Sequence, residues 1–273
     1  ARADDDPPPR RNEVAAVPVV AGNSDIGLQL GLVGSLTRFE DGAKPFAWRL
    51  DGVLSSSGKV DVKVGLSAQA PVVLEKAYND LSGSFDYHEG GFSGAPKFPR
   101  PTTLNLLFRL HKYFAKIEES QSSWSLEMAL KTLRAMANGG LRDHLGGGFH
   151  RYSVDGYWHV PHYEKMLYDQ AQLLSAYVEG WQLSGSDFYA QIARQTVLYV
   201  KRELTHAEGG FYSAEDADSL ASADAEHKTE GAFYVWKAAE IDELLGAREG
   251  SIFRYSYGAR KDGNARPESD PHG

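Results

Sequence analysis

Cysteine is absent from all 273 residues of the chain, which excludes disulfide bonds, thiolate metal sites and Cys-x-x-Cys redox chemistry within them. No run of 18 apolar residues occurs, so the sequence predicts no membrane-spanning helix. Basic residues number 29 against 37 acidic ones, and the formal net charge is −8. Because no long basic stretch is present, nucleic acid is a poor candidate partner.

The start of the chain also lacks a targeting signal. It begins at Ala1, and the acidic, proline-rich residues 4–11 (DDDPPPRR) match neither a signal peptide nor a basic amphipathic transit segment. We expect this start to be a disordered tail. A cytoplasmic location is favoured, although a cysteine-free chain suits other compartments too.

The pattern of the sequence changes near residue 66. Residues 1–66 contain short apolar runs at 14–20, 28–36 and 60–66, which could be weak strands but show no clear period. We predict a poorly ordered or atypical N-terminal segment there, and a second domain over residues 67–273. In that domain apolar residues recur at helical spacing, which predicts six helices near 70–85, 102–117, 124–136, 163–183, 188–204 and 236–245.

A Gly-Gly-Phe phrase returns between these helices, at 90–92, 147–149 and 209–211, with intervals of 57 and 62 residues. This period predicts helix-hairpin repeats that bury their apolar faces against one another. Two loops also predict β-hairpins, 148–152 with 156–160 and 211–213 with 232–236. The fold that fits is mostly α: an incomplete α/α toroid with short β-hairpins on one rim, where binding chemistry usually lies.

Polar side chains are densest between residues 138 and 170, where four of the nine histidines fall. We predict that Pro161 begins a helix, with His162, Met166 and Asp169 on one face. A histidine and a carboxylate on one face can divide the general acid and base roles. Our acid/base candidates are His150, His162, Glu164, Asp169 and Glu215, and our substrate-binding candidates are Arg142, Asp143, Arg151, Trp158, His159 and Asp216.

Several of these candidates have a simpler interpretation. Asp143 and His144 could brace stray backbone groups of a glycine-rich loop. Lys97, between two prolines, more simply orients the next helix than binds an anion. Glu215 could supply a second carboxylate for glycoside chemistry, whereas the polar run 220–230 has the composition of a solvated loop.

A zinc site is an alternative, because His159 and His162 have usable ligand spacing and Glu164 or Asp169 could be a third ligand. The two histidines straddle a strand end, a proline and a helix start, however, and this arrangement favours divergence. We therefore expect neither a metal nor another cofactor.

Long motifs in consistent order resemble the spermatogenesis-associated protein 20 family. They are GGFSGAPKFP from residue 90, MANGGLRDH from 136, GFHRYS from 148, WHVPHYEKMLYDQ from 158 and GGFYSAEDADS from 209. Full-length members of that family join an N-terminal thioredoxin-like domain to a six-hairpin α/α toroid, which is similar to those of glycosidases and N-acylglucosamine 2-epimerase. The resemblance covers residues 66–273, implies part of the toroid only, and implies a carbohydrate-active or carbohydrate-binding role.

Two functional hypotheses follow. The first is epimerase-like or glycosidase-like acid/base chemistry on a sugar-like ligand, with activity expected to be lower in this fragment than in full-length relatives. The second is a non-catalytic binding or regulatory toroid that works with the thioredoxin-like domain of those relatives. It predicts satisfied polar pairs, such as Asp143 with Arg151.

Overall fold

The computed structural model describes residues 11–23, 27–39, 48–55, 60–63, 70–222 and 224–266. The chain divides into two compact units, residues 1–77 and 78–273. The predicted boundary at residue 66 falls outside the described residues and stays a prediction, as does the atypical character of residues 1–66.

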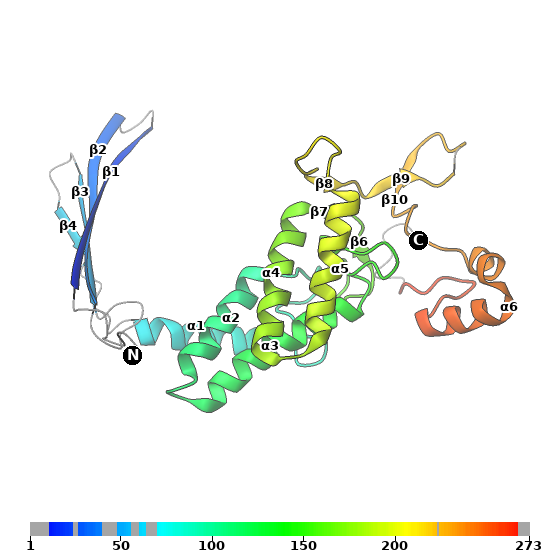
Figure 1. Cartoon of the computed structure of the whole chain (residues 1–273), viewed down its shortest axis with the longest axis horizontal. Helices are drawn as coiled ribbons and strands as arrows, with labels where there is room; N and C mark the ends of the chain where they lie inside the picture. The colour runs from blue at the N-terminus through cyan, green and yellow to red at the C-terminus, as the bar shows by residue number, and fades with distance from the viewer. Residues whose placement is uncertain are drawn as a thin grey trace, which may run out of the picture. The chain divides into compact units, whose positions relative to one another are not determined.

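The first unit contains a four-stranded antiparallel sheet, whose strands follow one another in sequence order (Figure 1). Strands β1 and β2 pair along their whole length, from Arg11 opposite Phe39 to Asn23 opposite Gly27. The apolar runs at 14–20 and 28–36 lie inside these two strands. The strands are β1 (Arg11–Asn23), β2 (Gly27–Phe39), β3 (Trp48–Ser55) and β4 (Val60–Lys63).

Helices dominate the described part of the second unit, which confirms the mostly α prediction. They are α2 (Pro101–Phe114), α3 (Glu119–Asn138), α4 (Leu167–Ser184), α5 (Asp187–Glu203) and α6 (Ala238–Tyr257), preceded by α1 (Ala70–Ser84), which runs across the division between the two units. Helix α6 is interrupted at Gly246, whose φ of 78° and ψ of 167° are not helical. No helix in the described ranges is both long and apolar enough to cross a bilayer.

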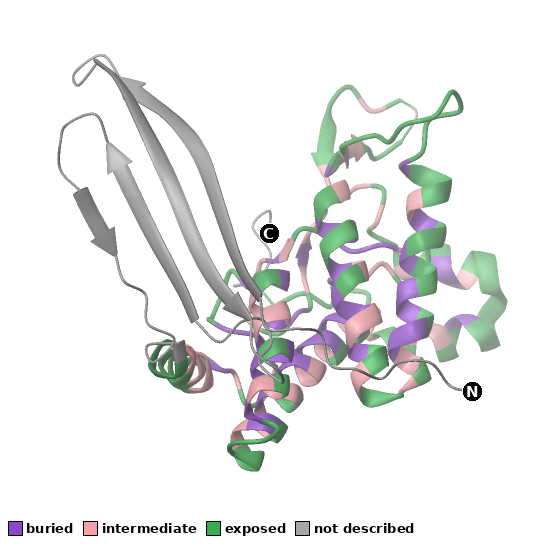
Figure 2. Cartoon of the chain, turned by 60° about the vertical axis from the view of Figure 1, so that its left-hand side comes forward, coloured by how far each residue is buried: buried purple, intermediate pink, exposed green. Residues whose placement is uncertain are grey.

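Two helical hairpins, α2–α3 and α4–α5, form the core. A short turn joins α4 to α5, because Gly185 ends α4 in the left-handed conformation, which glycine adopts without strain. Helix α4 lies against both helices of the first hairpin, and its Tyr177 hydroxyl donates a 2.7 Å hydrogen bond to the Leu133 carbonyl of α3. The helix faces that meet here are largely buried (Figure 2).

Close approach of α4 depends on Gly180. A Cβ atom at this position would lie 3.1 Å from Leu133 Cδ1, and 3.8 Å from Phe108 Cζ. Two consecutive hairpins stacked in this way form an arc of an α/α toroid. The long connections after α1, α3 and α5 all lie at the same end of the arc because the helices alternate in direction, and this end is the predicted rim.

The Gly-Gly-Phe phrase is a structural repeat of the rim. Isolated β-bridges join Phe92 to Phe85, Phe149 to Arg142 and Phe211 to Thr205. Each phenylalanine therefore pairs with a residue six or seven positions earlier, near the end of the preceding helix. All six glycines of the phrase have positive φ, which explains why this residue type recurs there.

The predicted rim hairpins are wrong in register. Strand β5 (Tyr152–Ser153) pairs with β6 (Pro161–His162), not with residues 156–160. The loop 211–213 does not pair with 232–236. Instead β7 (Lys165–Met166) pairs with β8 (Ala214–Glu215), and β9 (Asp218–Leu220) pairs with β10 (Lys228–Glu230).

The predicted start of the fourth helix is also wrong. Helix α4 begins at Leu167, so Pro161 and His162 lie on a strand rather than on the first helical turn. His162 and Asp169 consequently do not share a helix face. The pairing of β6 and β7 with other strands holds this stretch extended.

Gly148 tests how closely the rim loop packs. A Cβ atom there would lie 2.5 Å from the Tyr199 ring, whereas one at Gly210, with a similar φ of +81°, would meet nothing within 4 Å. We expect Gly210→Ala to cost about 1 kcal/mol from backbone strain alone. Gly148→Ala should cost at least about 1 kcal/mol more because of the added overlap, measured by urea denaturation. Equal losses in the two variants would contradict this packing.

Candidate functional site

The rim strands divide the candidate residues into two groups. Successive side chains of an extended backbone point to opposite sides, so Glu164 and Lys165 face different surroundings. We call Arg151, His162, Glu164, Asp169 and Glu230 the open cluster. We call Asp143, His150, Lys165, Tyr199, Glu215 and Tyr234 the buried cluster.

The open cluster is centred on His162. Its Nδ1 atom lies 2.6 Å from Glu230 Oε1, and its Nε2 atom lies 3.8 Å from Glu164 Oε2. Glu164 Oε2 also accepts a 3.0 Å hydrogen bond from Arg151. One imidazole therefore stands between two carboxylates, each about a quarter exposed.

Asp169 is the least satisfied member of this cluster. Its side chain is buried in the first turn of α4, and its Oδ2 atom has no hydrogen-bond partner among the described residues. Burial raises the pKa of Asp169 to about 7, against an opposing influence of Arg151 and with a smaller increase from Glu164. The carboxyl group can therefore hold or release a proton near neutral pH.

Aromatic rings border the open cluster. The Tyr152 ring stacks on His162 with a centroid distance of 4.9 Å, and Phe98 stacks on Tyr152 at 4.7 Å. Phe98 and Tyr168 are 40% and 45% exposed. The open cluster thus combines titratable groups with partly exposed ring surfaces.

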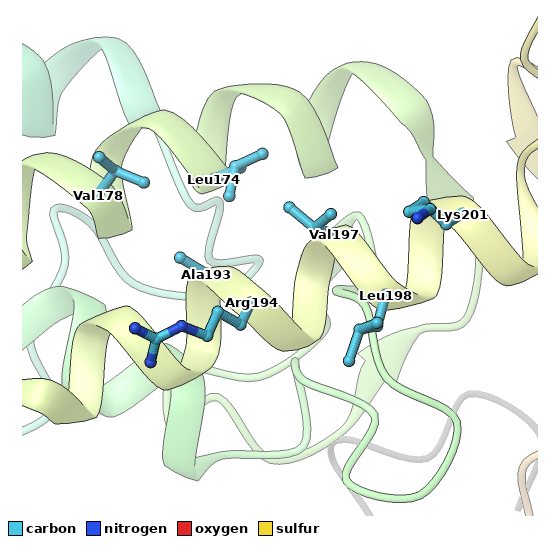
Figure 3. A pocket seen from close by; sticks show the side chains of 7 residues that line it. All are labelled: Leu174, Val178, Ala193, Arg194, Val197, Leu198 and Lys201. Carbon is cyan, nitrogen blue, oxygen red and sulfur yellow. The ribbon is translucent and has the colours of Figure 1, made fainter.

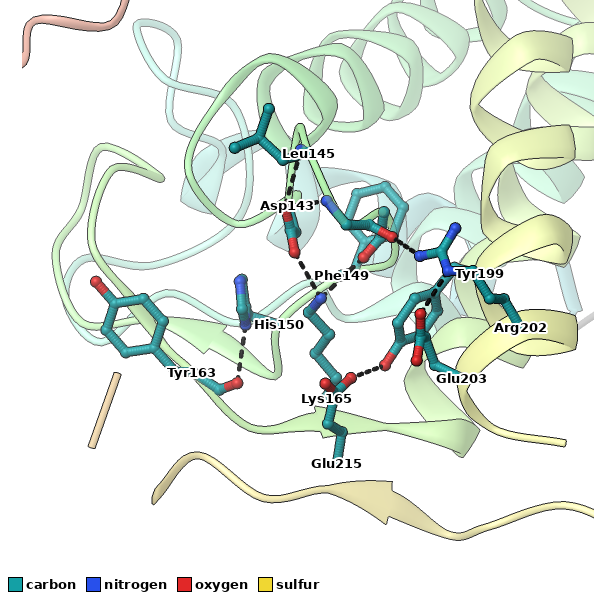
Figure 4. Close-up of polar contacts among 12 residues, drawn as sticks. Asp143, Leu145, Phe149, His150, Tyr163, Lys165, Tyr199, Arg202, Glu203 and Glu215 are labelled. Carbon is teal, nitrogen blue, oxygen red and sulfur yellow. Dashed lines mark hydrogen bonds and ion pairs between the residues drawn. The ribbon is translucent and has the colours of Figure 1, made fainter. Parts of the chain in front are cut away.

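The buried cluster is built around Lys165, which is almost wholly enclosed (Figure 4). Its Nζ atom donates hydrogen bonds of 2.9 Å to Asp143 Oδ2 and to the Gly147 carbonyl. The same ammonium lies 4.7 Å from the centre of the Tyr199 ring and 4.8 Å from that of Tyr234. The expected partner of Asp143 was Arg151, and this prediction is wrong because Lys165 takes the place.

Asp143 also organises its own loop. Its Oδ1 atom accepts backbone hydrogen bonds from Leu145 and Gly146. Burial alone would raise the pKa of Asp143, but the attraction of Lys165 and these hydrogen bonds lower it overall. Asp143 therefore stays ionised and acts as a brace, which is the simpler interpretation of its position.

Two acid/base candidates belong to this enclosed group. Tyr199 donates a 2.6 Å hydrogen bond to Glu215 Oε2, and burial together with this contact raises the pKa of Tyr199. His150 is buried, and its Nδ1 lies 2.9 Å from the Tyr163 carbonyl. Burial, followed by repulsion from Lys165, lowers the pKa of His150 to about 3, so its ring is neutral at physiological pH.

The remaining substrate-binding candidates are dispersed. Arg142 donates hydrogen bonds to the Ala137 carbonyl and to Gln195 Oε1, both at 2.8 Å. Asp216 is exposed, 3.5 Å from Lys228. Trp158 is 1% exposed, so its ring face is not open to a ligand in this structure.

Trp158 instead joins two rim loops. Its Nε1 atom donates to the Glu89 carbonyl at 3.0 Å, and its φ of 60° is unusual for a tryptophan. Gly139 accommodates this conformation, because a Cβ atom there would lie 2.4 Å from the Trp158 carbonyl oxygen. The ring is thus a wedge between the first and second Gly-Gly-Phe loops.

Lys97 repeats the arrangement of Lys165. It is fully buried and donates to Asp86 Oδ2 at 2.6 Å and to the Gly156 carbonyl at 2.9 Å. Asp86, like Asp143, stands six residues before the phenylalanine of its Gly-Gly-Phe phrase. Lys97 therefore holds two rim loops together, a structural role that differs from the expected one of orienting the next helix.

Sequence reasoning missed Glu230, Tyr199 and Tyr234. Glu230 lies at the end of a polar run with the composition of a solvated loop. The pairing of β10 with β9 holds the strand from which Glu230 contacts His162. The tyrosines gave no local signal, since their significance comes from Lys165 and Glu215, which are distant in sequence.

Two cavities lie outside both clusters. One, of about 450 Å³, is an apolar groove between α4 and α5 with two basic side chains at its margin (Figure 3); it is lined by Leu174, Val178, Ala193, Arg194, Val197, Leu198 and Lys201. The other, of about 430 Å³, includes His159 and the segment that follows α6. Within the described ranges, no group of three or more His, Asp or Glu side chains is arranged to hold a metal ion.

The opposite pKa shifts of Asp169 and His150 predict a measurable pH dependence. Between pH 3.8 and about 7 the folded state keeps the Asp169 proton that the unfolded state releases, so this group lowers stability as pH rises. Between pH 6.5 and about 3 the unfolded state protonates His150 first, so that group lowers stability as pH falls. The two slopes oppose each other.

Asp169→Asn removes one of these slopes. Relative to the unsubstituted chain, the variant should lose on the order of 1.4 kcal/mol of unfolding free energy per pH unit on acidification from pH 6.5 to 4.5. Urea denaturation at several pH values measures this. Asp187→Asn, in the exposed first turn of α5, is the matched control, and parallel curves for both variants would refute the raised pKa.

No family model matches the sequence. Human spermatogenesis-associated protein 20 is 46% identical over 226 residues, which is 78% of this chain and 28% of that protein. The mouse protein is 44% identical over the same shares, and the uncharacterized protein B0495.5 of Caenorhabditis elegans is 41% identical over 74% of this chain and 28% of its own length. The chain thus spans little more than a quarter of the length of these relatives.

Solved structures with partial similarity include two sugar epimerases. Cellobiose 2-epimerase from Spirochaeta thermophila is 20% identical with a TM-score of 0.41, covering 60% of this chain and 43% of that one. The Bacillus thermoamylovorans enzyme is 13% identical with a TM-score of 0.43, covering 68% and 54%. The chain is 41–46% identical to these longer relatives, and its motifs between Gly90 and Ser219 resemble those of the same family. Over the aligned residues, the chain therefore belongs to the spermatogenesis-associated protein 20 family.

Proposed function

We propose that the open cluster is an acid/base site for a carbohydrate ligand on the rim of the toroid. The observation that carries this proposal is Asp169, whose buried carboxyl group has a pKa of about 7 and an oxygen without a hydrogen-bond partner among the described residues. A group that is half-protonated near neutral pH is suited to general acid catalysis.

His162 supplies the complementary base. Glu230, 2.6 Å from Nδ1, orients the imidazole and favours the tautomer with the proton on that nitrogen, which leaves Nε2 to accept a proton. Nε2 faces Glu164, 3.8 Å away. Arg151 pairs with Glu164 and limits the accumulation of negative charge beside Asp169.

The surroundings fit a sugar better than a highly charged ligand. Three carboxylates and one arginine give the cluster a net negative character, which disfavours anions. Partly exposed aromatic faces beside carboxylates suit the apolar faces and hydroxyl groups of a pyranose ring. Both epimerase-like proton transfer and glycoside cleavage use such an acid and base.

A non-catalytic binding toroid is the second candidate. The pairs Asp143–Lys165 and Tyr199–Glu215 are satisfied within the protein, and the neutral His150 is no acid near pH 7. Two of the five acid/base candidates, His150 and Glu215, thus have structural partners. Under this proposal the full-length relatives would present a sugar-like ligand or a partner to their thioredoxin-like domain.

Turnover and binding separate the two proposals. We expect the chain to be stabilised in thermal-shift assays by members of a neutral sugar panel, and to epimerise or hydrolyse at least one of them. Asp169→Asn should lower turnover by about 100-fold, within the usual range for removing a general acid, while the ligand-induced shift persists. The pH–rate profile should lose its transition near pH 7.

Asp187→Asn should leave turnover unchanged, since its side chain is exposed and outside the cluster. Saturable sugar binding without turnover would favour the non-catalytic toroid. If no sugar binds the chain, or if Asp169→Asn is as active as the unsubstituted chain, the proposed acid/base function is wrong.

A further inference from the structure

The second cavity has a chemistry different from that of the open cluster. It lies beside the end of α6 and measures about 430 Å³, within the usual range for small-molecule sites. It is lined by His159, Tyr257, Gly258, Arg260, Gly263, Asn264, Ala265 and Arg266. None of these lining residues carries a carboxylate.

This local charge runs against that of the whole chain. The sequence has a net charge of −8, yet two arginines and a histidine converge on one cavity. Within the described residues, neither Arg260 nor Arg266 forms an ion pair with Asp or Glu. The C-terminal end of α6 contributes a partial negative charge of about half an elementary unit, which is less than the charge of two guanidinium groups.

The donors are held in place by the surrounding residues. The Arg266 guanidinium lies 4.3 Å from the centre of the Tyr157 ring, and such stacking restrains the group while leaving its N–H edge available. The backbone of His159 is held by a 3.1 Å hydrogen bond that its N–H donates to Asp155 Oδ1, so the imidazole is the group of this residue that is left to donate. The Asn264 amide is anchored through its Nδ2 atom to the Tyr257 carbonyl, at 3.3 Å.

We propose that this cavity binds a phosphate-type oxyanion through Arg260 and Arg266, with His159 and Asn264 as further donors. Guanidinium groups bind tetrahedral oxyanions through paired, charge-assisted hydrogen bonds. The volume exceeds that of phosphate alone, so a small phosphorylated molecule fits the cavity as well as the free ion does. The inference does not rest on the proposed acid/base function.

The test is a titration of the 273-residue chain at low ionic strength, followed by calorimetry. The probes are inorganic phosphate, glucose 6-phosphate and glucose. We expect saturable binding of both phosphate compounds and none of glucose at this cavity. Tighter binding of glucose 6-phosphate than of phosphate would identify an organic phosphate as the occupant, and equal affinity would identify the free ion.

Substitutions locate the binding. Arg260→Ala with Arg266→Ala should weaken phosphate binding at least tenfold. Arg260→Lys with Arg266→Lys should weaken it less, because charge remains but the bidentate geometry is lost. Lys261→Ala is the matched control, since it removes a neighbouring exposed cation that does not line the cavity, and affinity should stay within about twofold by the weak effect of exposed charges.

Several results would overturn the proposal. They are no saturable phosphate binding, unchanged affinity in the double alanine variant, or an equal loss in Lys261→Ala, which would indicate unspecific attraction. Both arginines are exposed, so thermal melting should show that the variants fold. If the alanine variant does not fold, the lysine variant is used instead, and unchanged phosphate affinity in that variant would overturn the proposal. Asp169→Asn should bind phosphate normally, whether or not the acid/base proposal holds.

Discussion

The rim depends on a buried ion pair between an aspartate and a lysine. Asp143 and Lys165 lie on opposite sides of the second Gly-Gly-Phe loop, and their contact joins the end of α3 to the strand that enters α4. Removing two charges from water is costly unless further polar contacts are made. Here Lys165 also contacts the Gly147 carbonyl and two tyrosine rings, and Asp143 also accepts hydrogen bonds from two backbone N–H groups. Asp86 and Lys97 form an ion pair of the same kind beside the first Gly-Gly-Phe loop.

This ion pair also determines which way the neighbouring side chains face. With Lys165 held inward, the preceding residue, Glu164, must face the other way, toward His162 and Arg151. The enclosed side of the strand is polar and largely hydrogen-bonded, with the Tyr234 hydroxyl as an exception among the described residues, and such a network gives rigidity. The open side retains a carboxyl oxygen without a partner among the described residues. A rigid support beneath a less satisfied set of groups is the arrangement that precise site geometry requires.

Local patterns were sufficient for the existence of the helices, since apolar periodicity located five of the six within about five residues at each end. The sixth prediction, 236–245, covers only the part of α6 before its interruption at Gly246 and misses the part that runs on to Tyr257. Local patterns failed at the rim, because residues 161–166 are held extended by partners at Tyr152 and Glu215. No local propensity reports contacts of that kind, and the strong Pro161 signal was misleading for the same reason. The stretch 138–170 was identified from its composition alone, and it contains four of the five residues of the open cluster and three of the six residues of the buried cluster.

The sequence indicated which residues belong to the candidate site more readily than it indicated how they divide into the open and the buried cluster. His162, Glu164 and Asp169 were expected together. His162 lies 3.8 Å from Glu164, which pairs with Arg151, whereas Asp169 is connected to this group through its electrostatic interactions with Arg151 and Glu164. His150 and Glu215 have the right chemical types, but burial and aromatic neighbours separate them from that cluster. Glu230 stands 68 residues from His162 in sequence, in a run whose composition resembles any exposed loop, so its contact could be found only in three dimensions.

The Gly-Gly-Phe bridges have a consequence for how such a rim can diversify. Each bridge closes its loop within six or seven residues of a helix end, so whatever follows starts from a fixed anchor. After the third bridge, β8 places Glu215 beside Tyr199, and β10 places Glu230 beside His162. The connection between β9 and β10 takes part in neither of these two contacts. Insertions and deletions in that connection leave the contacts of Glu215 and Glu230 intact. The rim therefore separates the residues that form the contacts of the two clusters from a connection whose length can vary, and changes of length can arise in the second without disturbing the first.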